Sequence, residues 1–184
     1  MRVAAPLLAA ALLGCAPMQQ VPGPADGASP DTIILSANTG QYDLRLLGSP
    51  VRKGELAASV KLRSFNSGDG FSTAAYVGFQ SGNDRRNSVH FFVAHVNPKD
   101  PYLTAGYRII EGGKETHREF LSYQRNLQTT IQVWLSFDEG ITTLKIEHLP
   151  PEVIRTPFSE VTRFLMVSSS KAEFKIDPSL RDLQ

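Results

Sequence analysis

The chain has 184 residues and a formal net charge of +1, with 19 lysines and arginines against 18 aspartates and glutamates. The opposite charges are interleaved, and no basic stripe or aromatic-basic motif points to nucleic acid as a partner. A single cysteine excludes an intrachain disulfide, so a folded domain must derive its stability from a packed core.

The first 14 residues have the pattern of an export signal. Met1 and Arg2 supply a short positive end, and residues 3–13 form an apolar run rich in alanine and leucine. Such a run is too short to cross a bilayer, which needs about 20 apolar residues, but it is typical of a signal peptide. A buried N-terminal helix is the alternative interpretation.

The sequence LLGC (residues 12–15) closes this run and resembles the lipobox of bacterial lipoproteins. The resemblance implies that Cys15 becomes the first residue of the mature chain and carries a diacylglycerol, with the new amino terminus acylated as well. Two or three acyl chains anchor a protein stably in the lipid bilayer. Ala16, in place of an aspartate after the cysteine, implies delivery to the outer membrane. We therefore expect an exported, membrane-anchored lipoprotein that faces the periplasm or the cell surface.

Residues 16–31 contain four prolines and two glycines but almost no large apolar side chains. Such a segment buries too little surface to offset the entropy of ordering. Residues 15–31 are therefore predicted to be the lipidated cysteine and a flexible tether, with a loop packed on the domain as the alternative. Residues 32–178 are long enough for one domain, and residues 179–184 form a short tail.

The domain is expected to be all-β. Residues 54–65 (GELAASVKLRSF) alternate apolar with polar side chains, as a strand with one buried face does. Residues 88–97 (SVHFFVAHVN) are apolar on both faces, which indicates a central strand covered on both sides. Gly112 and Gly113 lie in the middle of residues 104–120 and predict a hairpin, because such a turn needs positive φ.

A second hairpin is predicted over residues 129–149, with Glu139 and Gly140 in the turn. This register places Leu135 opposite Leu144 on an apolar face, and the other face is polar apart from one tryptophan. Because a one-residue slip would move every side chain to the opposite face, the agreement supports the register. Many short strands and no long helical period predict an antiparallel sandwich or barrel.

Two segments resemble concanavalin A-like domains of the LamG and glucanase type. Residues 134–141 have the form aromatic–Leu–x–aromatic–Asp–x–Gly–Ile, and residues 161–177 read as a strand, a small-residue turn and a last strand ending in aspartate. The resemblance implies a jelly roll, a β-sandwich of two curved antiparallel sheets, with ligands bound on the concave sheet or at loops along one edge. Such a fold does not by itself fix the function.

The spacing of the acidic residues along the sequence argues against catalysis of the glucanase type. A glycosidase needs two of them flanking the scissile bond, and glucanases of this fold carry acids that alternate on one strand. No two acidic residues of this chain are separated by a single residue, so we predict no catalytic residue; a glucanase-type hydrolase stays an alternative. Glu115, His117 and Glu119 are expected on one strand face, with Arg108 opposite His117, and we interpret them as a solvated face with charge pairs.

No cofactor is expected. The four histidines lack the spacing of a zinc site. Residues 66–70 (NSGDG) offer oxygen ligands for calcium, but a plain turn is the favoured interpretation.

Outward-facing aromatic rings predict a binding site, because sugars present apolar C–H faces between their hydroxyls. Trp134 is expected on a polar strand face, and the alternative is that a loop or the second sheet covers its ring. The predicted binding residues are Tyr76, Gln80, Phe92, Gln132, Trp134 and Lys145. The sequence thus predicts a lipoprotein whose non-catalytic, lectin-like sandwich binds a glycan or another envelope component. A structural or assembly lipoprotein that docks a protein partner is a further alternative.

Overall fold

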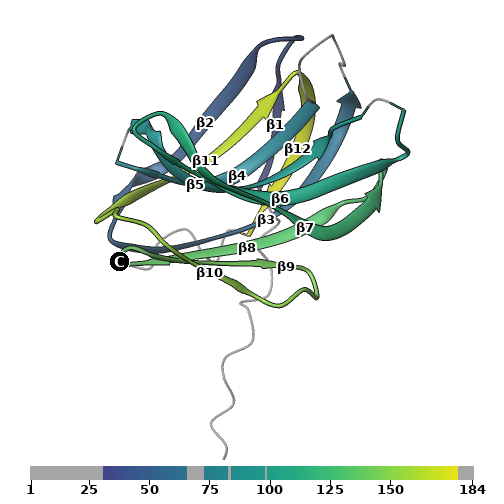
Figure 1. The fold of residues 1–184 in the computed structure, drawn as a ribbon. Coiled ribbons are helices and arrows are strands. Elements are labelled where there is room, and N and C mark those ends of the chain that lie inside the picture. The colour runs from purple at the N-terminus through teal and green to yellow at the C-terminus, as the bar shows by residue number, and fades with distance from the viewer. Residues whose placement is uncertain (1–30, 66–72, 83, 98, 178–184) are drawn as a thin grey trace, which may run out of the picture.

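The computed structural model describes residues 31–65, 73–82, 84–97 and 99–177. In this part of the chain the regular elements are twelve β-strands, which form two six-stranded antiparallel sheets packed face to face (Figure 1). These residues include no helix that is long and apolar enough to span a membrane. The prediction of an all-β, two-sheet sandwich is confirmed.

Each sheet combines strands from distant parts of the sequence. Sheet A contains, in spatial order, β1 (Asp31–Ser36), β12 (Ser170–Ile176), β3 (Lys53–Phe65), β8 (Ile131–Asp138), β9 (Ile141–Ile146) and β10 (Glu152–Arg155). Sheet B contains β2 (Tyr42–Val51), β11 (Val161–Ser168), β4 (Thr73–Ser81), β5 (Asp84–His95), β6 (Tyr102–Glu111) and β7 (Lys114–Asn126).

The hydrophobic core lies between the inner faces of the two sheets. On β3, Leu56 and Val60 are buried and alternate with more exposed side chains, as predicted. Phe79 of sheet B and Phe137 of sheet A are both fully buried, and their ring centroids are 6.0 Å apart. This contact joins the two sheets across the core.

The predicted register of the β8–β9 hairpin is confirmed. Leu135 lies opposite Leu144, and the turn residues Glu139 and Gly140 have φ values of 44° and 85°. A β-carbon at Gly140 would lie only 2.8 Å from the carbonyl oxygen of Thr156. Glycine therefore satisfies both the backbone conformation and the close approach of the neighbouring chain.

The predicted turn of the β6–β7 hairpin is confirmed too, since Gly112 and Gly113 have φ values of 58° and 81°. The predicted partner of Arg108 is wrong: it lies opposite Arg118 and not opposite His117. A β-bulge near the turn inserts one extra residue into β7 and shifts the pairing beyond it.

The chain changes sheet between β11 and β12. Ser169, with a φ of 48°, links β11 in sheet B to β12 in sheet A. Both strands take interior positions, β11 between β2 and β4, and β12 between β1 and β3. The small-residue turn predicted within residues 161–177 is therefore the crossing from one sheet to the other.

The first described strand begins at Asp31, one residue before the predicted start of the domain. The predictions for the signal peptide, for Cys15 and for residues 16–30 lie outside the described residues, as do those for residues 66–70 and 179–184.

Candidate functional site

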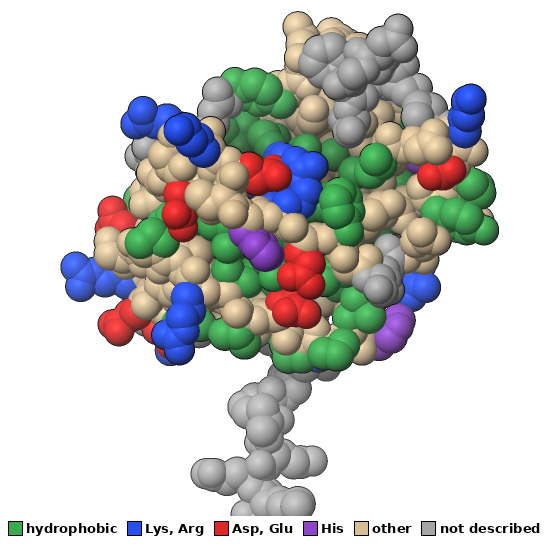
Figure 2. Space-filling view, in the orientation of Figure 1, with side chains coloured by type: hydrophobic (Ala, Val, Ile, Leu, Met, Phe, Trp, Pro, Cys, Tyr) green, Lys and Arg blue, Asp and Glu red, His purple; other side chains and the backbone are tan. Residues whose placement is uncertain are grey.

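The outer face of sheet B, which points away from the core, is hollowed into a groove of about 340 Å³. Strands β2, β11, β4, β5 and β6 contribute to its lining, which includes Tyr42, Tyr76, His90, Arg108 and Phe164. Figure 2 shows hydrophobic side chains in a hollow, with basic and acidic side chains next to each other below it. The groove thus combines apolar side chains with charged groups.

The outer face of sheet B carries a second apolar cluster, separate from the core between the sheets, and two of its members, Tyr76 and Phe164, line the groove. The cluster consists of Ala74, Tyr76, Phe92, Ala94 and Phe164. All five side chains are buried although they point away from the sandwich. The side chains of residues 88–95 of β5 are buried on both faces of the strand, as predicted, and on the outer face they are buried by neighbouring side chains of the same sheet.

Two glycines make room for His90 and for the apolar cluster. Gly78 lies opposite His90, and a β-carbon at Gly78 would overlap the β-carbon of His90 and lie 2.5 Å from the carbonyl oxygen of Val89. At Gly106, a β-carbon would lie 2.6 Å from Cζ of Phe92. A larger residue at either position would push His90 or Phe92 out of place.

The central polar contact of the groove joins two neighbouring strands. Nε of Arg108 donates a hydrogen bond of 2.7 Å to Nε2 of His90. Because Nε2 accepts, the neutral imidazole carries its proton on Nδ1, which lies 3.3 Å from Oγ of Ser88. The guanidinium also lies over the ring of Tyr76, with Cζ 4.9 Å from the ring centroid. These contacts hold Arg108 in one orientation.

Burial lowers the pKa of His90 well below its usual value of 6.5, and the positive charge of Arg108 lowers this pKa further. At neutral pH the imidazole is therefore an uncharged acceptor, and the positive charge of the pair lies on Arg108.

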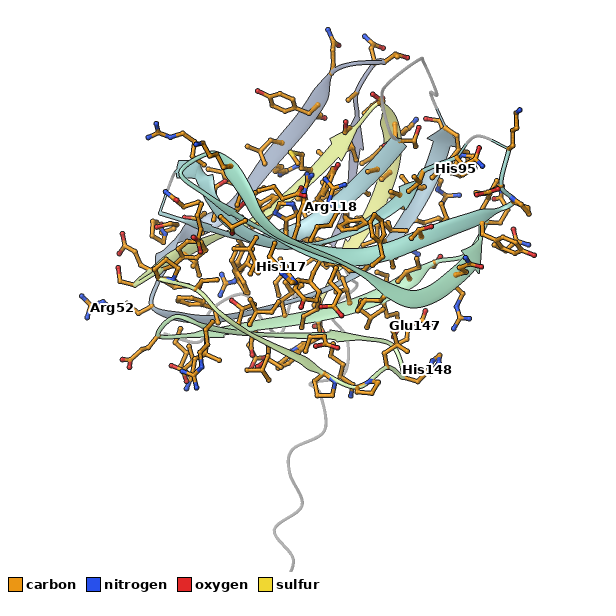
Figure 3. The ribbon with its side chains drawn as sticks, viewed as in Figure 1. Arg52, His95, His117, Arg118, Glu147 and His148 are labelled. Atoms are coloured by element: carbon orange, nitrogen blue, oxygen red, sulfur yellow. The ribbon has the colours of Figure 1, made fainter. Side chains whose placement is uncertain are left out.

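Glu115 connects Arg108 to a second arginine. Its Oε2 accepts a hydrogen bond of 3.4 Å from Nη1 of Arg108 and one of 2.6 Å from Nη2 of Arg118. Figure 3 shows Arg118 and His117 on opposite sides of β7. We call His90, Arg108, Glu115 and Arg118 the charged row.

The accessible aromatic ring of the groove is Tyr42. Its exposed fraction is 54%, against 9% for Tyr76, which lies beneath Arg108. Because β2 is the edge strand on the far side of sheet B from β6 and β7, a ligand would meet Tyr42 on one side and the charged row on the other.

The structure divides the six predicted binding residues between opposite faces of the sandwich. Those on the outer face of sheet B are Tyr76, Gln80 and Phe92. Those on the outer face of sheet A are Gln132, Trp134 and Lys145. The two sets are separated by the core, so they cannot contact one small ligand together.

Trp134 is half-buried on sheet A. Its Nε1 donates a hydrogen bond of 3.4 Å to Oε2 of Glu55 on β3, and Lys145 is its cross-strand neighbour, as predicted. The ring is therefore tied to its own sheet and lies far from the groove.

Glu115 does not share a face with His117 and Glu119, contrary to the prediction. The bulge in β7 turns Glu115 towards the groove, whereas Glu119 accepts a hydrogen bond of 2.7 Å from the hydroxyl of Tyr107. His117 stacks on the same Tyr107 ring, with centroids 5.5 Å apart. Burial raises the pKa of Tyr107, and the hydrogen bond to the Glu119 carboxylate raises this pKa further.

The side chains of the groove offer guanidinium N–H groups, hydroxyls and an exposed ring, and the described residues that line it include no carboxylate. In the described ranges, no group of three or more His, Cys, Asp or Glu side chains is placed to hold a metal ion. This combination suits a ligand with an apolar face and polar edges.

Sequence reasoning missed Tyr42, His90 and Arg118 as residues of this site, and it named Arg108 only as a cross-strand partner of His117. One signal was present, because His90 is a titratable residue within an otherwise apolar strand. No comparable signal marks Tyr42, since pattern alone does not show that β2 lies beside β11.

No protein-family model matches the chain, and no curated protein matches it. Among solved structures, a carbohydrate-binding module from Bacillus subtilis superposes with a TM-score of 0.52 at 14% identity, covering 82% of this chain and 89% of that one. A transglycosylase in complex with NAG superposes with a TM-score of 0.54 at 9% identity, covering 83% of this chain and 74% of that one. At such low sequence identities the likeness shows only the fold, which is a jelly-roll sandwich. The kind of ligand has to be inferred from the residues of the groove.

Proposed function

We propose that this domain binds a carbohydrate in the groove of sheet B. The observation that carries the proposal is the pairing of an exposed ring, Tyr42, with a charged row whose arginines are already held in place. A sugar has apolar C–H faces that pack on an aromatic ring and hydroxyls that accept hydrogen bonds from guanidinium groups. Because Arg108 is fixed by His90 and Tyr76 before the ligand arrives, little side-chain freedom is lost on binding.

The likeness of the fold to a carbohydrate-binding module and to a transglycosylase in complex with NAG supports this proposal. The number of carboxylates in the charged row favours binding without catalysis. A glycosidase needs two that flank the scissile bond, whereas the charged row has one, Glu115, which is engaged by both arginines.

We further propose that the domain acts in a bacterial envelope, tethered through an acylated Cys15. The sequence of residues 1–31 supports this part of the proposal: a short apolar run, a lipobox-like LLGC and a proline-rich segment. Such a tether would present the domain near the outer membrane, towards the periplasm or the surface, where glycans are available.

A glycan array probed with the purified domain tests the proposal. The variant Tyr42→Ala removes the exposed ring of the groove and should abolish or strongly weaken every signal of the wild type. The matched control is Trp134→Ala, which removes a ring from the opposite face and should leave the signals unchanged. Thermal melting of both variants shows whether they are folded. Signals that survive Tyr42→Ala but vanish with Trp134→Ala would move the site to sheet A.

A further inference from the structure

We propose that the saccharide bound in the groove is acidic and that its carboxylate is recognised by Arg108 and Arg118. This inference rests on the proposed function, because it names the class of sugar that the same groove would take.

The charges around the groove are unbalanced. Arg86 and Arg108 line it, Arg118 lies beside Arg108 through their shared partner, and Glu115 is the carboxylate between the two. With His90 neutral, the two guanidinium groups of the charged row share one carboxylate, which leaves an excess of one positive charge in the row. An anionic ligand would reduce this excess, whereas a neutral sugar would leave it in place.

Both arginines of the charged row keep N–H groups for a ligand. Arg108 uses Nε for His90 and Nη1 for Glu115, and Arg118 uses Nη2 for Glu115. Among the described residues, Nη2 of Arg108 and Nε and Nη1 of Arg118 have no hydrogen-bond partner. Guanidinium groups match the planar geometry of a carboxylate, often with two parallel hydrogen bonds.

The protein itself shows that a carboxylate fits here, since Glu115 already contacts both guanidinium groups. The surroundings also strengthen such a contact. The side chain of Arg108 is only 21% exposed, and it lies over an aromatic ring that belongs to the apolar cluster. Partial exclusion of water makes an ion pair with a ligand stronger than the same pair on an open surface.

The experiment compares acidic glycans with their neutral counterparts on the full-length domain. Oligogalacturonate and its methyl ester are one matched pair, because esterification removes the charge and keeps the sugar backbone. The array also carries other uronate-containing glycans with their esters, sulfated glycans and neutral glycans. We expect signals from carboxylate-bearing glycans that fall about tenfold or more on esterification and that weaken as salt is raised.

Arg118→Gln should lower the affinity for the carboxylate glycan about tenfold and should remove most of the difference between the acid and its ester. The matched control is Arg155→Gln, which removes one positive charge from the exposed side of β10 on the other sheet and should leave affinity unchanged. Equal losses of affinity in the two variants would show that the effect comes from the net charge of the protein. Such a result would overturn the assignment of Arg118.

The outcomes of the array separate the two proposals. Binding of neutral or only sulfated glycans would overturn the carboxylate inference and leave carbohydrate binding in place. A folded domain that binds no glycan of any class would overturn the proposed function itself.

Discussion

Nε of Arg108 donates a hydrogen bond of 2.7 Å to Nε2 of His90, so a buried neutral histidine fixes the guanidinium at the centre of the groove. The imidazole can accept this bond only while it is unprotonated. The position of Arg108 and the stability of the domain therefore both depend on the protonation state of one side chain.

His90 should make the free energy of unfolding fall as the pH drops below about 6.5. Its pKa is lowered in the folded state, so below the usual value of 6.5 the unfolded chain binds a proton that the folded chain rejects. The loss should approach about 1.4 kcal/mol per pH unit until the folded pKa is reached, and above pH 6.5 this contribution should be constant.

Urea unfolding of the wild type and of His90→Gln between pH 4.5 and 8 measures this effect. Glutamine keeps an acceptor for Arg108 but does not titrate, so the stability of the variant should depend less steeply on pH below 6.5. Because the other titrating groups are common to both proteins, parallel curves would show that His90 is not the cause.

Gly78→Ala should destabilise the domain by about 1–3 kcal/mol, the usual range for overpacking. The new methyl group would overlap the β-carbon of His90 and press on the carbonyl of Val89, and backbone atoms cannot move aside cheaply. Chemical unfolding measures the loss. Val153→Ala is the control, because that side chain is 65% exposed and its truncation should cost about 0.5 kcal/mol or less. A Gly78→Ala protein as stable as the control would contradict the close contact.

Phe137→Ala should cost about 3–5 kcal/mol of unfolding free energy, because a fully buried ring between the sheets would leave a cavity. Phe120→Ala is the matched comparison, since its ring is 51% exposed on the outer side of sheet B. Phe120→Ala should lower the free energy of unfolding clearly less than Phe137→Ala does, although the change removes an edge-to-face contact between Phe120 and Phe92. Similar losses in calorimetry would mean that the core is not where the structure places it.

Cys15→Ser should abolish lipid attachment and leave the precursor unprocessed at that position. Metabolic labelling with a fatty acid, followed by mass spectrometry of the N-terminus, measures both effects. Ser29→Ala, within the proposed tether, should keep the label. Label retained on the Cys15→Ser protein would overturn the lipoprotein proposal.

The sequence was sufficient to predict the fold class and the register of the β8–β9 hairpin. Alternation with period two shows which side chains of a strand share a face, and Glu139-Gly140 then sets the pairing of Leu135 with Leu144. The same period does not show which sheet a hairpin joins. For that reason Trp134 and Tyr76 were placed in one predicted site, although the structure puts them on opposite faces of the sandwich.

The charged row could not be predicted because it depends on a bulge. Counting outwards from Gly112-Gly113 in a regular hairpin places Arg108 opposite His117, and a single extra residue in β7 moves Arg118 there instead. A strand can contain such an extra residue without any distinctive residue type in the sequence. Alternation alone therefore predicted the wrong cross-strand partner for Arg108.

The crossing at Ser169 determines when the domain can complete its folding. The edge strands β1 and β2 are made early, yet the strands that lie beside them, β12 and β11, are made from residues 161–176. Until the ribosome has released those residues, neither edge strand has its hydrogen-bonded neighbour, and neither sheet can close. Pairings between such distant segments also form slowly, because the loss of chain entropy precedes the gain in contacts. Folding of the sandwich therefore cannot be completed before residues 161–176 are available, however early the other strands are made.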